Sequence, residues 1–350
     1  MSGQRGISLV ELMIGIVVAL LVGMAASGAA VFFNASQKQG IGTGGVLINT
    51  TTALSAMKED ISQMGLGFFG DSSYLCDDLN LSLDTNDLSQ TGFAPLQVSR
   101  AGNYDRVDIV YANAVAGGAN VMLAAPATSA SAAVKSYLPA ASGAAVLFAG
   151  KPDSAIRRCT VRTVTATTPA ANPTTPQTIS YDNGGLHNRF AFAAPINYGT
   201  DDRVALLGGL SWQRYAVDAN GNLTLTRRLD GGASAVLVRD VVAFKVRYGV
   251  TSGALNENAI VDWEPPTGVW STLGPANIAR VRAIQIGIVT RSPQMERRDA
   301  AGNCTASEAP PRLLEETLNT STLPADWACY RYRTAVVTVP LRNVALGLIR

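Results

Sequence analysis

Histidine is nearly absent from this chain of 350 residues, because His187 is the only one. It lies in Asn-Gly-Gly-Leu-His-Asn-Arg, residues 183–189, a composition typical of a turn. A Ser-His-Asp or Cys-His mechanism would depend on this single side chain. The adjacent acids at 201–202 and 315–316 lie in polar, turn-rich sequence, and we interpret them as solvated charges. The sequence therefore predicts no catalytic residue and no enzyme.

Charged residues are also scarce, at 15% with a net charge of +2, against about 25% in an average soluble domain. This balance argues against a nucleic-acid-binding protein, which needs a clustered basic surface. The four cysteines include no Cys-x-x-Cys pair, so they offer no zinc or redox site. The acidic segment 84–87 resembles calcium ligands, but it lacks the loop glycine and the terminal glutamate. We expect no cofactor and no metal.

One long apolar run is present, from Ile7 to Phe33, and its single charged residue is Glu11. Its 27 residues are enough for a helix that crosses a hydrocarbon core of about 30 Å. An acidic side chain inside such a helix costs roughly 2.5–3.5 kcal/mol on insertion scales. We therefore expect Glu11 to have a partner of opposite charge.

A polar leader that ends in Gly6, the acidic Glu11 five residues later and the long apolar run together resemble the class III signal of type IV prepilins and pseudopilins. The resemblance implies that a prepilin peptidase cleaves after Gly6 and methylates the new amino terminus of Ile7. It also implies that Glu11 neutralises the amine of a neighbouring subunit during filament entry, an attraction that grows as the dielectric constant falls. An ordinary signal anchor or a cleavable secretory signal is the alternative.

Arg5 precedes the apolar run, so the positive-inside tendency places the amino terminus in the cytoplasm. The rest of the chain is then exported to an oxidising compartment, in which disulfides persist. The four cysteines allow three pairings. We favour Cys304 with Cys329, because the segment between them is rich in Pro, Ser and Thr and gains most from a cross-link, and by elimination Cys76 with Cys159.

Small residues recur every four positions in the apolar run, at Ala19, Gly23 and Ser27. Such a stripe lets another helix approach closely. In a pilin it would face the neighbouring amino-terminal helices of the filament. A helix that is merely rich in Ala and Gly explains the pattern equally well.

Residues 40–45, Gly-Ile-Gly-Thr-Gly-Gly, match G-x-G-x-x-G, but they follow a membrane helix instead of a strand, so we reject a nucleotide site. We expect a flexible break of the helix here, since glycine costs about 1 kcal/mol relative to alanine in a helix interior. Beyond it, an amphipathic stripe predicts a second helical half that packs on a sheet and ends at Gly65 and Gly67. The stripe consists of Leu47, Leu54, Met57, Ile61 and Met64.

The rest of the chain has the patterns of strands and loops. Alternation of apolar and polar residues predicts strands at 106–111 and 156–164. Asn-Gly at 220–221 marks a hairpin between strands at 212–217 and 223–227.

Residues 68–91 are acidic and have the composition of a loop. Residues 112–145 are rich in Ala, Gly and Ser, and residues 165–178 are rich in Thr, Pro and Ala, so we expect both segments to form exposed loops or weak hairpins.

Three strand-like segments close the chain, at 236–250, 278–292 and 332–343. They contain V-x-Y-G-V, V-R-A and V-x-L-R-N in that order, which is similar to the C-terminal half of PilW-type minor pilins. Segment 57–69 also resembles the end of that family's helix. The resemblance implies a subunit that joins other minor pilins and the major pilin in a complex at the pilus tip. Such a complex primes polymerisation on the inner-membrane assembly platform and helps display a tip adhesin of the PilY type.

We predict an α+β, pilin-like fold, with a long N-terminal helix packed on an antiparallel sheet that carries large loop insertions. Its parts would be a leader (1–6), a transmembrane and filament-core helix (7–33), an amphipathic continuation (34–67) and a periplasmic β-rich domain (68–350). The chain would first span the inner membrane once and later join the pilus. The alternatives are a J-type minor pseudopilin of type II secretion, a class that is typically much shorter, and a membrane-tethered periplasmic enzyme or binding domain.

Overall fold

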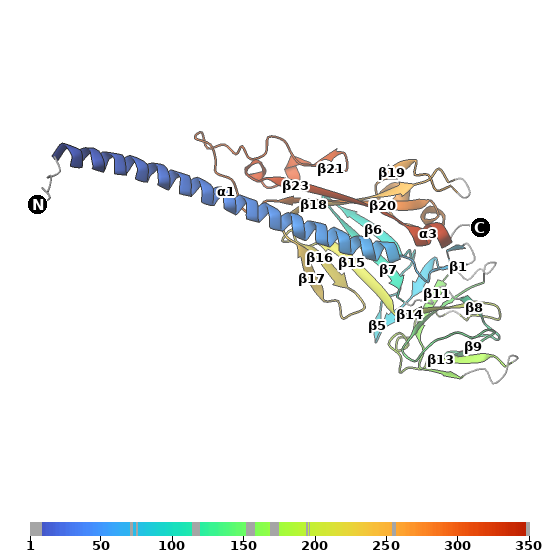
Figure 1. Ribbon diagram of the computed structural model, residues 1–350. Helices are drawn as coiled ribbons and strands as arrows, with labels where there is room; N and C mark the ends of the chain where they lie inside the picture. Colours follow the sequence, from blue (N-terminus) through green and yellow to red (C-terminus); the bar gives the residue numbers. More distant parts are fainter. Residues whose placement is uncertain are drawn as a thin grey trace, which may run out of the picture.

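A long helix and a β-rich body make up the protein in the computed structural model, which describes residues 9–70, 73–74, 76–113, 120–151, 158–168, 175–193, 195, 197–253 and 257–347. Helix α1 (Leu9–Gln63) protrudes from the body by its first half (Figure 1). The cleavage site expected between Gly6 and Ile7 lies outside the described residues.

Helix α1 is continuous for 55 residues, so the break expected at 40–45 is wrong. Each glycine weakens the helix by about 1 kcal/mol, but helical hydrogen bonding propagates cooperatively from the flanking turns. The end expected at Gly65 and Gly67 is confirmed, because both have positive φ, 74° and 87°. A Cβ on Gly67 would lie 2.5 Å from Cδ2 of Leu207, so this turn also requires a residue without a side chain.

The main sheet has nine strands in the order β17-β16-β15-β7-β18-β20-β23, with β6 paired to β7 and β19 to β18. All neighbours are antiparallel except β7 and β18, which meet in parallel at a single residue pair. The strands are β6 (Leu96–Ala101), β7 (Tyr104–Ala112), β15 (Leu210–Val217), β16 (Leu223–Arg227), β17 (Ser234–Val238), β18 (Val241–Val250), β19 (Asp262–Glu264), β20 (Val281–Arg291) and β23 (Tyr332–Pro340).

The strands predicted from alternation and from the Asn-Gly turn are confirmed. Strand β7 contains 106–111, and β15 and β16 form a hairpin in which Val217 pairs with Leu223. Gly221 has the positive φ, 75°, that this turn needs. The three C-terminal segments form β17 with β18, β20 and β23.

The second half of α1 crosses the face of this sheet. It contacts β7 near the middle of the sheet and both edge strands, β17 and β23. The predicted stripe is buried as far as it is described, because Leu54, Met57, Ile61 and Met64 are each at most 6% exposed. The helix therefore supplies one side of the main hydrophobic core.

A carboxylate near the end of α1 fixes the helix to the sheet. Asp60 accepts hydrogen bonds from the Tyr111 hydroxyl on β7 at 2.8 Å and from the Tyr215 hydroxyl on β15 at 2.5 Å. Burial, and then the bond to Asp60, raises the pKa of Tyr111 to about 12 and raises that of Tyr215 as well. The amide of Asn343 donates to the carbonyls of Ser62 and Met64 and so caps the same helix end.

A second β lobe lies at the end of the body remote from the helix amino terminus (Figure 1). It contains a five-stranded sheet, β3-β11-β10-β14-β8, and a three-stranded sheet, β12-β13-β9. Its strands are β3 (Asp78–Asn80), β8 (Asn120–Met122), β9 (Ser131–Val134), β10 (Ala145–Ala149), β11 (Arg158–Thr163), β12 (Ala166–Thr168), β13 (Gln177–Ser180) and β14 (Arg203–Gly208).

The five-stranded sheet is buried on both faces. On β10, Leu147 belongs to the main core and Val146 and Phe148 belong to the core of the second lobe. Strand β14 alternates in the same way, with Leu207 on the main core and Leu206 on the other. The lobe and the body therefore share one sheet as a common layer.

Strands β12 and β13 pair antiparallel, as the alternative of a weak hairpin expects. The alternative of loops is wrong for 112–145 and 165–178, because these segments supply β8, β9, β12 and the first half of β13. Their small residues alternate between buried and half-buried positions, as in β9, while the aromatic rings that complete the core come from outside them. The expected loop at 68–91 also contains β3 and short hairpins. The strand predicted at 156–164 is confirmed as β11.

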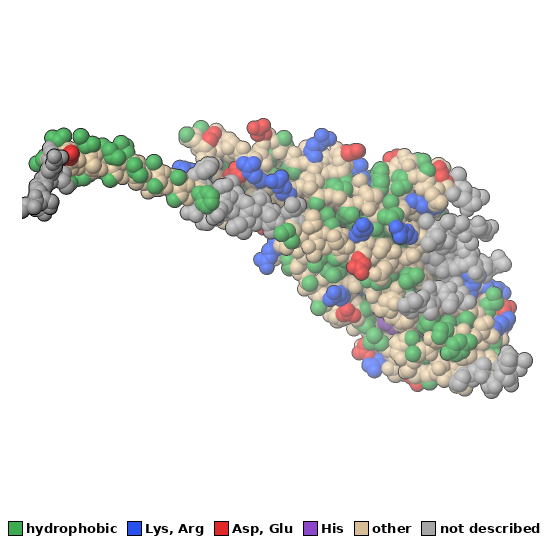
Figure 2. Space-filling view, in the orientation of Figure 1, with side chains coloured by type: hydrophobic (Ala, Val, Ile, Leu, Met, Phe, Trp, Pro, Cys, Tyr) green, Lys and Arg blue, Asp and Glu red, His purple; other side chains and the backbone are tan. Residues whose placement is uncertain are grey.

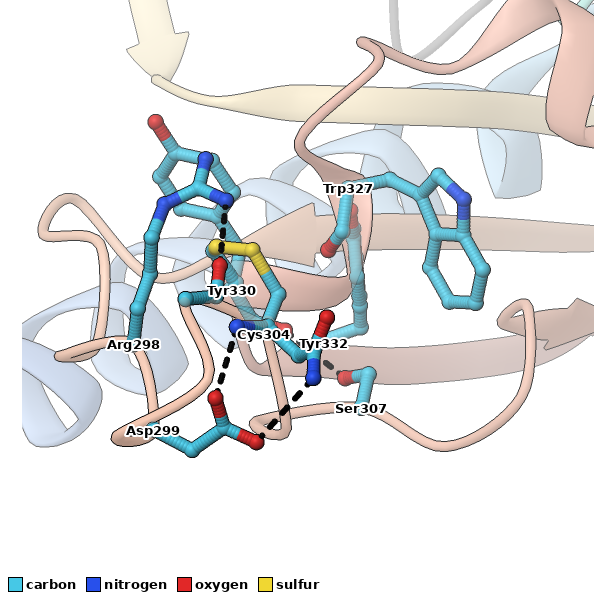
Figure 3. The surroundings of a disulfide bond; sticks show 10 residues. Arg298, Asp299, Cys304, Ser307, Trp327, Tyr330 and Tyr332 are labelled. Atoms are coloured by element: carbon cyan, nitrogen blue, oxygen red, sulfur yellow. Dashed lines mark hydrogen bonds between the residues drawn. A yellow bond between two sulfur atoms is a disulfide. The ribbon is translucent and has the colours of Figure 1, made fainter.

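Both disulfides join the pairs that the sequence favours, Cys76 with Cys159 and Cys304 with Cys329. The second lies in a segment of turns after β20, where side chains around it bond to the backbone (Figure 3). The Ser307 hydroxyl donates to the Tyr330 carbonyl at 2.7 Å, and the Tyr332 hydroxyl to the Trp327 carbonyl at 2.9 Å. The cross-link therefore holds a segment with little regular structure.

Short elements complete the described chain. They are β1 (Phe69–Gly70), β2 (Ser73–Tyr74), β4 (Ser82–Leu83), β5 (Asn86–Asp87), the 3-10 turns Gly268–Trp270, Thr320–Thr322 and Trp327–Cys329, α2 (Pro275–Ile278), β21 (Arg312–Leu313), β22 (Glu316–Thr317) and α3 (Arg342–Gly347).

The Asp60 contact predicts a measurable loss of stability on substitution. In Asp60→Asn one tyrosine hydroxyl donates to a neutral oxygen instead of a charged one, and the other hydroxyl faces an NH₂ group that cannot accept its hydrogen bond. The free energy of unfolding should therefore fall by about 1–3 kcal/mol. Denaturant unfolding in detergent measures this change. Glu59→Gln is the matched control, because Glu59 is exposed and carries the same chemistry one residue away. Equal stability of the two variants would contradict the assigned role.

His187 predicts a pH dependence. The ring lies in the expected turn but is 5% exposed, and its Nδ1 donates to the Ser82 carbonyl at 2.5 Å. Burial lowers the pKa of His187 below 6.5, with the Ser82 bond opposing the shift. The unfolded chain therefore binds this proton first, and the free energy of unfolding falls as the pH drops below about 6.5.

Between pH 7 and pH 5, the free energy of unfolding should fall less in His187→Asn than in the unsubstituted protein. The asparagine amide can still donate a hydrogen bond to the Ser82 carbonyl, but it does not bind a proton in this pH range. Denaturant unfolding at several pH values measures the difference. Since His187 is the only histidine, all other titrations are shared by both proteins. Parallel curves would show that the histidine does not cause the loss.

Candidate assembly site on the protruding helix

The first part of α1 is apolar, and no other described part of the chain buries it. Within the described residues, Leu9–Ala30 is the one helical span long and apolar enough to cross a membrane, and none of it is buried. Figure 2 shows hydrophobic side chains along the visible face of this part of the helix. An exposed apolar surface of this extent marks contact with a membrane or with other protein.

Glu11 lies in the first turn of α1, among these apolar side chains. A carboxylate there is favoured by the positive end of the helix dipole. Its expected partner, the amine of Ile7, lies outside the described residues. The structure thus places a single acidic side chain at the start of a helix that is otherwise apolar as far as Ala30.

The small residues Ala19, Gly23 and Ser27 share one side of the exposed helix. Gly15 was not part of the predicted stripe, but it extends the stripe at the same spacing of four residues. The Ser27 hydroxyl donates to the Gly23 carbonyl at 2.8 Å, so it is satisfied inside the helix. A Cβ on Gly23 would meet no atom within 4 Å. The surface is therefore open to another helix.

The acids set aside as solvated charges do not converge on a site, but one of them is buried. Asp202 is 4% exposed and accepts hydrogen bonds from the amides of Gly199 and Lys151 at 2.7 and 2.9 Å. It therefore holds a turn, and the interpretation as a solvated charge is wrong for this residue. Its neighbour Asp201 pairs with Lys135 on the surface.

The acids that resemble calcium ligands are held by protein groups instead. Asp84 pairs with Arg189 at 2.5 Å, and Asp87 accepts from the amide of Ser89 at 2.9 Å. Over the described ranges, no group of three His, Cys, Asp or Glu side chains is arranged to hold a metal ion.

Comparison with known families locates a match in the C-terminal part of the chain. The model of the Type IV Pilus-assembly protein W family, PilW, matches residues 214–343. Over these residues the chain is similar to the PilW family. The PilW region begins within β15 and ends in α3, so it builds most of the main sheet on which α1 lies. This agrees with the resemblance noted in the C-terminal strands.

Among solved structures, a type IV-like pilin from Thermus thermophilus is similar to this chain at 10% identity and a TM-score of 0.33. The similarity covers 87% of this chain and 97% of that one. No curated protein sequence matches the chain. The long helix packed on an antiparallel sheet gives the chain the α+β fold predicted from sequence.

The small-residue stripe predicts a position-specific effect on helix association. Gly23→Leu fills open space in the isolated chain, so its stability should not change, but a partner helix should be held off. We expect the cross-linking yield with pilin helices in membrane vesicles to fall about tenfold, which corresponds to a modest loss of contact free energy. Gly28→Leu is the control, because Gly28 is equally open and lies about 140° around the helix. An equal fall in cross-linking yield in both variants would show that the stripe does not form the contact between helices.

Proposed function

We propose that this chain is a type IV prepilin that becomes a minor pilin and helps start pilus assembly. The observation that carries the proposal is the combination of an uncovered apolar helix of 22 residues with a body that matches PilW over 214–343. A soluble protein would have to hide such a helix, whereas a filament subunit buries it first in the membrane and then among other subunits.

In this proposal a prepilin peptidase removes residues 1–6 and leaves the amine of Ile7 at the start of the membrane helix. The amine is a cation, and Glu11 of one subunit pairs with the amine of its neighbour. Two opposite charges attract far more strongly in an apolar medium than in water, so the pair is favoured where the helices meet. The position of Glu11 in the first turn, at the exposed end of α1, supports this role.

The body would lie in the periplasm while the helix spans the inner membrane with its amino terminus in the cytoplasm. Two disulfides among the described residues suit an oxidising compartment. After extraction by the assembly platform, the subunit would join other minor pilins and the major pilin near the tip. There the complex would support an adhesin of the PilY type.

The assembly role is tested in a strain that lacks only this chain. We expect surface pili, counted by electron microscopy, to be lost or sharply reduced, while secreted exoproteins in the same culture stay normal. Return of the intact gene should restore pili. Return of Glu11→Val should yield a cleaved protein that does not restore them, and Glu11→Asp should restore them in part because it keeps the charge.

Other outcomes separate the alternatives. Normal pili with exoproteins trapped in the periplasm would make the chain a pseudopilin of type II secretion. No change in either, with residues 1–6 retained in the mature protein, would favour a membrane-tethered periplasmic domain. Normal piliation with Glu11→Val would contradict the proposed charge pairing.

A further inference from the structure

A pocket of about 150 Å³ opens in the second β lobe, outside the residues that match PilW. It is lined by side chains of β3, β10 and β11, by residues 127–129, 195, 197 and 198, and by Tyr181 and Phe192. Because one water needs roughly 10–15 Å³ by a comparable measure, the pocket holds a ligand of on the order of ten non-hydrogen atoms. That is the size of one sugar ring with its substituents.

Aromatic rings form much of the wall, and hydrogen bonds hold two of them in place. Phe148 contacts Tyr181 and Tyr198, with ring centroids 5.3 and 5.6 Å apart. The Tyr181 hydroxyl lies 2.8 Å from the Thr128 and Ser131 carbonyls. The Tyr198 hydroxyl lies 2.9 Å from the carbonyl of Arg158. These rings are already ordered, so a ligand that packs against them does not have to order them.

Arg162 places a positive charge in the lining of the pocket, beside these aromatic rings. The residue is half-buried on β11, and its guanidinium lies 5.0 Å from the centre of the Phe192 ring. Its polar contact is a long one, 3.4 Å to the His187 carbonyl, and no carboxylate in the described part of the chain pairs with it. Burial lowers the pKa of Arg162, because the charged form is partly desolvated.

A guanidinium has five N–H donors and matches a carboxylate with two parallel hydrogen bonds. A partly desolvated cation without a counter-charge is costly, and an anion that enters the pocket removes that cost. The other polar side chains at the pocket are neutral amides and hydroxyls, and no carboxylate lines it. They are Asn80, Thr128, Ser129, Thr160 and Asn197.

We propose that this pocket binds an acidic sugar residue, a hydroxylated ring that carries a carboxylate. The carboxylate pairs with Arg162, the apolar face of the ring packs on the aromatic wall, and the sugar hydroxyls bond to the amide and hydroxyl groups at the pocket. A bare inorganic anion would use Arg162 alone, and a neutral sugar would leave the cation unpaired. The ligand class thus follows from the combination of a cation, aromatic rings, and neutral amide and hydroxyl groups in one pocket.

The lobe stands at the end of the molecule remote from the apolar helix (Figure 1). The pocket therefore stays accessible when the helix is in a membrane. The proposal does not depend on the pilus role, since a tethered periplasmic protein would present the same pocket.

The test is a binding titration of the full chain in detergent, followed by nuclear magnetic resonance or calorimetry. The probes are glucuronate, galacturonate and N-acetylneuraminate, with glucose and galactose as neutral rings and acetate as a bare carboxylate. We expect at least one acidic sugar to bind about tenfold or more tightly than every neutral probe and than acetate. Equal binding of acidic and neutral sugars, or no binding by any acidic sugar, would overturn the proposal.

Arg162→Gln should reduce the affinity for that acidic sugar about tenfold and remove the preference over the neutral ring. Arg189→Gln is the control, because it removes one positive charge from the same lobe at an exposed residue that does not line the pocket. Retained affinity in Arg162→Gln would overturn the assignment of the carboxylate site. Should Arg162→Gln not fold, the comparison of acidic with neutral probes on the parent chain decides the question alone.

Discussion

Burial of the second half of α1 across the nine-stranded sheet is the interaction on which the rest of the structure depends. Met57, Ile61 and Met64 are almost fully buried, and each such side chain contributes about 1.5–3 kcal/mol relative to exposure. Asp60 then fixes the helix through two tyrosine hydroxyls from different strands. The first half of the helix receives no such support, so its environment has to come from outside the chain.

The sequence predicts this part of the fold well because its signals are local. The apolar stripe at 54–64 has the period of a helix, the Asn-Gly turn defines a hairpin, and the long C-terminal strands are rich in β-branched residues. The features of α1 proposed for assembly are equally local, since Glu11 and the stripe of Ala19, Gly23 and Ser27 are recognised from their spacing in the sequence. Asp60 was missed because its partners lie 51 and 155 residues away along the chain.

The second lobe could not be predicted in the same way. Strands β10 and β14 are buried on both faces, so they show no alternation of apolar with polar residues. Strands β9 and β12 consist of Ala, Ser and Thr, with Val134 as the one larger apolar residue, and so resemble loop sequence. The rings that complete their core come from 148, 181 and 198, which are separated in sequence. The pocket depends on the same distant residues. Only tertiary pairing brings Arg162 and Phe192 together.

The Cys76–Cys159 bond has a mechanical consequence. A pull on Arg162 reaches α1 along the backbone to Cys159, through the disulfide to Cys76 and then along the chain to the helix. The cross-link bypasses a chain separation of 83 residues, which fully extended would span roughly 280 Å. The segment between the two cysteines cannot be extended by force while the disulfide is intact. Traction on the lobe therefore has a short covalent path to α1, in parallel with the hydrogen bonds that join β11 to β3 and β10.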